Sequence, residues 1–130
     1  MEFPWIAAIV SGVLAYGLGA LWYSPLLFGN SWMAAMGKSP DDMIMSPKLY
    51  AICFVTWLLA GFMFTALVVM TGYTNLASLI CIAIVGFLGF TVVPIIMANI
   101  FEGTRSRVSM ISGSYHLSAY LLMALVNWVL

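Results

Sequence analysis

Charged residues are scarce in this sequence. Four acids and four bases make up 6% of its 130 residues, and 65% of the residues are hydrophobic, whereas a soluble domain carries about a quarter charged residues. So few charges cannot cover a globule in water, but they suffice for the rim of a protein whose solvent is mostly lipid. The net charge is zero and no long basic run occurs, which argues against nucleic acid as a partner. The composition predicts an integral membrane protein surrounded by the lipid bilayer.

Side chains that bind metals are equally rare. The chain has one histidine and two cysteines, and a metal site needs several convergent ligands. Cys53 and Cys81 are predicted near opposite membrane faces, more than about 10 Å apart along the membrane normal, which is beyond disulfide reach. We expect both cysteines to pack as small apolar side chains in the core. We expect neither a metal nor a cofactor.

Long apolar runs dominate the chain instead. A helix needs about 20 residues to cross the ~30 Å hydrocarbon core, and four runs reach that length. The expected spans are residues 4–24, 47–71, 76–101 and 108–130. They predict a single all-α membrane domain over residues 1–130, an integral membrane four-transmembrane-helix bundle with an interfacial segment between the first two helices. The short "TGYTN" between the second and third spans predicts that these two are antiparallel neighbours.

The basic residues indicate an orientation. All four lie in or beside two loops on the same side of the membrane, residues 25–47 and 102–107: Lys38, Lys48, Arg105 and Arg107. Because cytoplasmic loops carry the excess of Lys and Arg, we expect these loops in the cytoplasm and both termini on the outer, periplasmic side of the cell inner membrane. The first span has Glu2 and no base before it, so we expect it to be retained rather than cleaved as a signal peptide.

An uncharged aromatic stretch, "LWYSPLLFGNSW", follows the first span. Trp22 and Tyr23 are expected to end the first helix at the headgroup level, where amphipathic rings prefer to sit. Pro25 stops the helix, and the apolar residues after it are too few to span, which places them in the interface. The segment is either a foot that fixes the angle of the first helix or a binding lip for a lipid or ligand.

Three motifs give the chain a resemblance to a known family. "LWYSPLLFG" followed by Trp32, "NIFEGTR" at 99–105 and "YHL" at 115–117 resemble the small bacterial and fungal membrane proteins catalogued as domain-of-unknown-function family 1761. The resemblance covers nearly the whole chain and implies the same four-helix layout, but no chemistry. The small multidrug resistance exporters match in length and helix count only. They carry a glutamate inside the first helix, and residues 4–24 contain no acid.

His116 is the only histidine and the only ionisable group well inside a span, which makes it a functional candidate. Pro94 removes a helical hydrogen bond and frees the carbonyl of Phe90, at nearly the predicted depth of His116. Tyr16 and Thr56 are predicted at the same depth, so the four groups would form a polar layer. His116 either bridges to the Phe90 carbonyl and locks two helices together, or it serves a ligand or a proton.

A polar face of the fourth span adds to these candidates: Ser109, Ser112, His116, Tyr120 and Asn127. The full set of candidate binding residues is Tyr16, Thr56, Thr91, Asn99, Glu102, Arg105, Arg107, Ser112, His116 and Tyr120. Glu102 is expected either to pair with the two arginines at the headgroups or to leave them to recognise a lipid phosphate. Glu102 lies at the interface and His116 well below it, so we predict no catalytic residues and no enzyme.

Small residues repeat along the first span, at Ser11, Gly12, Ala15 and Gly19. Such spacing lets membrane helices approach closely, either within the bundle or between subunits. The function expected first is therefore a non-catalytic packing or partner subunit, or a homo-oligomer. The alternatives are an oligomeric small transporter or channel, and a binder of a small molecule or lipid with a polar layer around His116.

Overall fold

The computed structural model describes residues 2–42 and 46–130, and every regular element within these ranges is helical. The elements are α1 (Trp5–Trp22), α2 (Gly29–Met36), the 3-10 turn η1 (Pro40–Asp42), α3 (Pro47–Thr71), α4 (Leu76–Gly86), the π-helical turn η2 (Phe87–Thr91), α5 (Val92–Phe101) and α6 (Ser106–Val129). Four helices are long and apolar enough to cross a membrane, with α4, η2 and α5 forming one of them. The predicted all-α membrane fold with four spanning helices is confirmed.

Local signals set the helix ends, as the sequence predicts. The Ser46 side chain accepts a hydrogen bond from the Leu49 N–H at 3.4 Å, and Pro47 occupies the first turn of α3. Asn75 caps α4 in the same way, with the Ser78 N–H donating at 2.9 Å. Helix α3 ends at Gly72, whose left-handed φ of 72° suits glycine.

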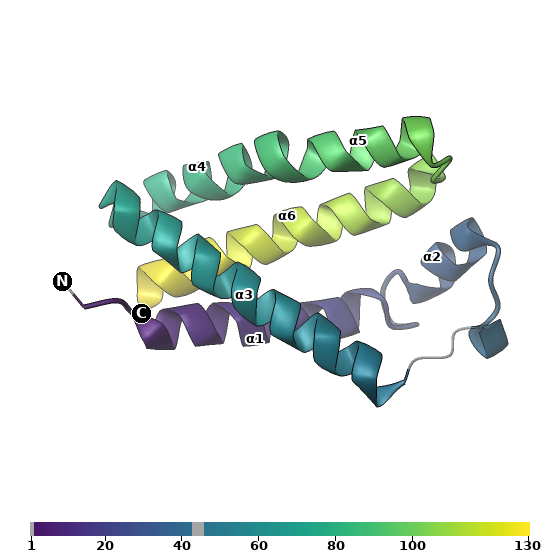
Figure 1. Ribbon diagram of the computed structural model, residues 1–130, viewed down its shortest axis with the longest axis horizontal. Helices are drawn as coiled ribbons and strands as arrows, with labels where there is room; N and C mark the ends of the chain where they lie inside the picture. The colour runs from purple at the N-terminus through teal and green to yellow at the C-terminus, as the bar shows by residue number, and fades with distance from the viewer. Residues whose placement is uncertain (1, 43–45) are drawn as a thin grey trace.

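The two ends of the bundle differ in charge. Both termini and the connection between α3 and α4 lie at one end, whereas the α5–α6 loop, α2 and the start of α3 lie at the other (Figure 1). The second end carries all four basic residues that the sequence predicts on one side. Residues 43–45 of the 25–47 loop lie outside the described part of the chain.

Helices α1 and α6 form the centre of the bundle. Helix α3 packs chiefly on α1, α4 packs on α6, and α1 and α6 pack on each other. Figure 1 shows α3 crossing α1 on a diagonal. The prediction that the second and third spans are antiparallel neighbours fails for their packing, because α3 and α4 make few contacts with each other. Their short connection keeps only the adjoining ends together.

Two glycines face each other where α1 and α3 cross. A Cβ atom placed on Gly61 would lie 2.5 Å from the Gly12 nitrogen and 2.6 Å from the Ala8 carbonyl oxygen. A Cβ on Gly12 would lie 2.7 Å from the Leu58 Cα. These distances are shorter than any side chain tolerates, so the two backbones touch directly, as small residues allow in membrane helices.

The small residues of α1 are used within one chain. Ser11 and Ala15 are 0% exposed, Gly12 meets α3, and a Cβ on Gly19 would lie 2.5 Å from the Tyr115 hydroxyl of α6. This corrects the prediction that a second subunit or a partner binds through these four residues. Ser11, Gly12 and Ala15 are buried, and Gly19 is half-buried against Tyr115. A contact within the bundle is therefore the alternative that holds.

We predict opposite effects of alanine at two glycines of α1. Gly12→Ala should lower the free energy of unfolding by about 1–3 kcal/mol, because the added methyl group overpacks the crossing with α3. Gly17→Ala should leave it unchanged or raise it by up to about 1 kcal/mol, because nothing lies within 4 Å of a Cβ at Gly17 and alanine favours the helix. Reversible unfolding in mixed micelles measures both; equal losses would contradict the packing described here.

Candidate functional site

Polar side chains join α6 to α1 at several heights. The Asn127 amide donates to the Ser11 hydroxyl at 3.3 Å. Nearer the basic end, the buried Tyr115 hydroxyl donates to the Ala15 carbonyl at 2.7 Å. Since polar groups that are satisfied between helices replace the missing hydrophobic drive in a bilayer, these bonds fix α6 against α1 along most of its length.

Two other polar side chains of α6 reach the third span. The Ser109 hydroxyl donates to the Asn99 side-chain carbonyl on α5. The hydroxyls of Tyr120 and Thr91 lie 2.8 Å apart, which ties α6 to the π-helical turn η2. Ser109 and Tyr120 therefore link α6 to two different elements of the third span, and the predicted candidates on this face do not gather in one layer.

The π-helical turn η2 lies just before a proline in the same span. Pro94 lacks an N–H and its ring would clash with the carbonyl of Phe90, and the chain widens into a π turn at Phe87–Thr91, just before it. Phe90 itself is 81% exposed on the outer face. The carbonyl that the sequence assigns to His116 is therefore on a residue that faces away from the bundle.

His116 bonds within its own helix. Its Nδ1 lies 2.6 Å from the Ser112 carbonyl oxygen, so the bond joins residues four apart in α6. The ring centroid lies 5.5 Å from that of Tyr115 and 5.6 Å from that of Trp57 on α3. The predicted bridge to Phe90 is wrong. Because a carbonyl only accepts, Nδ1 is the donor of this bond.

Two further members of the predicted polar layer lie elsewhere. Thr56 is exposed, and its hydroxyl donates to the Cys53 carbonyl of its own helix at 2.8 Å. Tyr16 is half-buried and packs edge-on against Phe54, with ring centroids 5.4 Å apart. The layer around His116 that depth counting predicts is therefore not formed. Counting gives height along the membrane normal but not the direction in which a side chain points.

The aromatic stretch after α1 folds back onto α6. The Trp22 indole N–H donates to the Ile111 carbonyl at 3.1 Å, and the Tyr23 hydroxyl donates to the Ser112 hydroxyl at 3.1 Å. Trp22 also packs against Phe28, with ring centroids 4.8 Å apart. The expected headgroup anchors thus hold the bundle together. They place α2 beside the start of α6 (Figure 1).

A groove opens between α1, α2 and α3, with Tyr115 of α6 also in its wall. Its volume is about 500 Å³. Its lining residues, called the aromatic groove below, are Tyr16, Gly19, Ala20, Tyr23, Trp32, Met33, Tyr50, Cys53, Trp57 and Tyr115. Six of these are aromatic and none is charged, which is the make-up of a site for an apolar small molecule. Cys53 and Cys81 are both exposed, which corrects the expectation that they lie in the core.

Most residues of the aromatic groove are missing from the sequence-based candidates. A signal for them exists in the spacing. Tyr16 and Tyr23 lie seven residues apart on one helix, and Tyr50 and Trp57 lie seven apart on another, so each pair shares a helix face. Only Tyr16 combines this signal with the depth argument.

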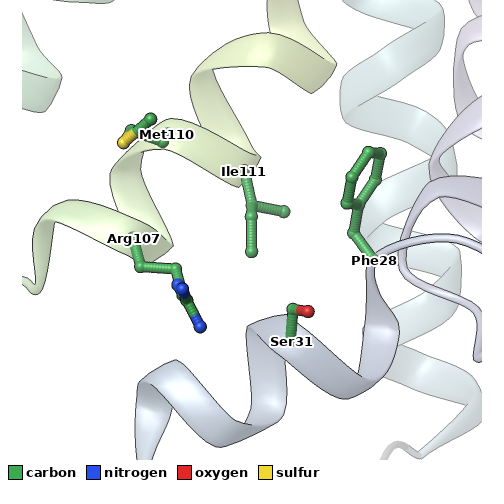
Figure 2. A pocket seen from close by; sticks show the side chains of 5 residues that line it. All are labelled: Phe28, Ser31, Arg107, Met110 and Ile111. Carbon is green, nitrogen blue, oxygen red and sulfur yellow. The ribbon is translucent and has the colours of Figure 1, made fainter.

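The charged residues near α6 are open to solvent or headgroups. Glu102, Arg105 and Arg107 are all exposed, and within residues 2–42 and 46–130 no ion pair forms between Glu102 and either arginine. The expected rim ion pair is therefore wrong. Arg107 instead lines a cleft of about 380 Å³ with Phe28, Ser31, Met110 and Ile111. It is called the α2–α6 cleft below (Figure 2).

Comparison with known proteins identifies a family. The family described as protein of unknown function (DUF1761) matches residues 6–128. The chain belongs to this family. The resemblance carried by the motifs around Trp22, Glu102 and His116 is thus confirmed over nearly the whole chain. Neither a curated protein nor a solved structure matches the sequence.

We predict that His116 contributes less to stability than Tyr120. His116→Leu should cost well below the ~0.6 kcal/mol average for polar bonds between membrane helices, because its bond lies within one helix and its loss leaves no partner on another helix unpaired. Tyr120→Phe and Thr91→Val should each cost about 0.6 kcal/mol, the average for such bonds in membranes. The double variant should cost little more than either single one, since both changes remove the same bond. Unfolding in mixed micelles provides the comparison, and a larger loss for His116→Leu would refute it.

Proposed function

We propose that this protein is a non-catalytic, multi-pass membrane protein that binds an uncharged, largely apolar molecule in its aromatic groove. The observation that carries the proposal is the groove itself. It combines a volume of about 500 Å³ with a lining of six aromatic side chains, and ligand pockets of about 300–1,000 Å³ with such linings are typical of small-molecule sites.

The polar groups of the groove favour a neutral ligand. The hydroxyls of Tyr23 and Tyr115 already donate to Ser112 and Ala15, so these two rings present mainly their apolar surfaces. In the described part of the chain the hydroxyls of Tyr16 and Tyr50 have no such partner, and either can orient a ligand. A charged ligand would lose its hydration here without gaining an opposite charge.

The same lining supports a binding role over catalysis. The residues of the groove include one thiol, Cys53, and no histidine, carboxylate, lysine or arginine. The titratable groups of the groove are this thiol and four tyrosines, and two of the tyrosine hydroxyls already donate within the protein. General acid–base catalysis uses histidine most often. This lining therefore favours a binding role for the groove.

A packing or partner subunit, or a homo-oligomer, is the second candidate. The span formed by α4, η2 and α5 has 11% of its most apolar window buried, against 33% for α6. A Cβ on Gly86 or Gly89 would meet nothing within 4 Å, so another helix could approach there. Native mass spectrometry of the detergent-solubilised protein tests for partners, and solute flux into liposomes tests the transporter alternative.

We predict that both termini face the periplasm of a bacterial inner membrane. The reason is that all Lys and Arg lie at the other end of the bundle, and such residues stay in the cytoplasm. A reporter that is active only outside the cytoplasm should be active when fused after Leu130 and inactive when fused after Lys38. The reverse pattern would overturn the orientation and leave the fold untouched.

We predict that filling the aromatic groove protects Cys53. In a Cys81→Ser background, Ala20→Trp should slow alkylation of Cys53 by N-phenylmaleimide about tenfold, because Ala20 lines the groove. Leu14→Trp is the matched control, since Leu14 is exposed on α1 but lies outside the groove. Diacylglycerol in the micelles should slow the reaction of the parent and not that of the Ala20→Trp variant.

Cys81 gives a second control for this experiment. It is exposed on α4, so in a Cys53→Ser background its alkylation should not respond to diacylglycerol or to Ala20→Trp. Equal protection of both cysteines, or equal slowing by Leu14→Trp, would mean that the probe senses the micelle and that the groove is not a binding site.

A further inference from the structure

The α2–α6 cleft differs in chemistry from the aromatic groove. Figure 2 shows the Arg107 side chain extending from α6 toward α2, where Ser31 lies, with Ile111 pointing into the same space. Phe28 closes one side of the cleft, and Met110 lies on the side of α6 that is farther from α2. A cation and a hydroxyl thus meet an apolar wall within one cavity of about 380 Å³.

The cleft is built into the fold. Ile111 is 8% exposed, and its carbonyl accepts the hydrogen bond from the Trp22 indole at 3.1 Å. Trp22 in turn packs on Phe28, and the Phe28 N–H donates to the Trp22 carbonyl at 3.0 Å. Two walls of the cleft are therefore held by the same indole. The spacing between α2 and α6 is set before any ligand arrives, which lowers the cost of binding.

Arg107 has no acidic partner to neutralise it in the described chain, and it is exposed. It lies in the first turn of α6, at the end of the bundle that carries every lysine and arginine. The end of a membrane-spanning helix lies at the headgroup level, where anionic lipid phosphates are concentrated. A guanidinium binds phosphate oxygens through two parallel N–H bonds.

We propose that the α2–α6 cleft binds the phosphate of an anionic lipid headgroup. Arg107 holds the phosphate, Ser31 donates a hydroxyl hydrogen bond to it, and the first carbons of the lipid lie along Ile111 and Phe28. The proposal goes beyond the neutral ligand of the aromatic groove and does not depend on it. The cleft volume of about 380 Å³ suits a lipid headgroup with the first carbons of an acyl chain better than a whole lipid.

Binding of single lipids to the purified full-length protein tests the assignment. Native mass spectrometry with titrated phosphatidylglycerol gives the affinity, and diacylglycerol with the same chains is the probe that lacks a phosphate. Arg107→Gln should weaken phosphatidylglycerol binding about tenfold or more. Arg105→Gln should change it less than about twofold, because it removes the same charge at a neighbouring position that does not line the cleft.

Other outcomes decide against the site or against its lipid. Equal losses for Arg105→Gln and Arg107→Gln would overturn the proposal in favour of diffuse attraction to a basic surface. If Arg107→Gln weakened diacylglycerol binding as much as phosphatidylglycerol binding, the proposal would also be overturned, because diacylglycerol has no phosphate. Competition by glycerol 3-phosphate at the same concentration as the lipid would overturn the lipid assignment, because the acyl chains of the lipid would then add nothing to the affinity. Both arginines are exposed, and the unfolding assay confirms that each variant is folded.

Discussion

The contact of α1 with both α3 and α6 is the constraint on which the other helix positions depend. Lipid chains are as apolar as leucine, so helices in a bilayer gain little by hiding leucines from lipid, and close packing must supply the attraction. Gly12 and Gly61 let the backbones of α1 and α3 touch. On the side toward α6, Ser11 and Ala15 are fully buried. Because α1 presents small residues to both α3 and α6, α3 can approach it closely, cross it on a diagonal and leave space beside the crossing.

That space is the aromatic groove, and Tyr115 connects it to the packing. The hydroxyl of Tyr115 bonds to the Ala15 carbonyl at 2.7 Å, in room that Gly19 leaves by having no side chain. Its ring lies 5.2 Å from that of Trp57 and 5.5 Å from that of Tyr23, centroid to centroid. The bond that joins two helices thus also positions the lining of the groove. A pocket held in this way needs little reordering when a ligand enters.

The sequence predicts what depends on neighbouring residues and fails where the direction of a side chain decides. Hydropathy and the caps at Ser46 and Asn75 are local signals, so the four spans and their ends follow from them. His116 is different. Its depth follows from counting residues along the helix. Its partner depends on whether Pro94 frees a carbonyl toward the bundle or is preceded by a π turn, and the sequence does not decide between these. The aromatic groove cannot be predicted for a related reason, since aromatic residues seven apart face lipid as readily as they line a pocket.

The weak contact between α3 and α4 has a consequence for how the chain assembles. The main partner of α1 is α3 and that of α4 is α6, so residues 5–71 and 76–129 form two helical hairpins that are each continuous in sequence. The α1–α3 and α4–α6 contacts can each form as soon as their own residues have been synthesised, whereas Trp22 and Tyr23 find their hydrogen-bond partners only when α6 is present. What remains is a single docking step, in which α6 meets the exposed side of α1. The turn at residues 72–75 is therefore the natural place at which the two hairpins could be made as separate chains and recombined in the membrane.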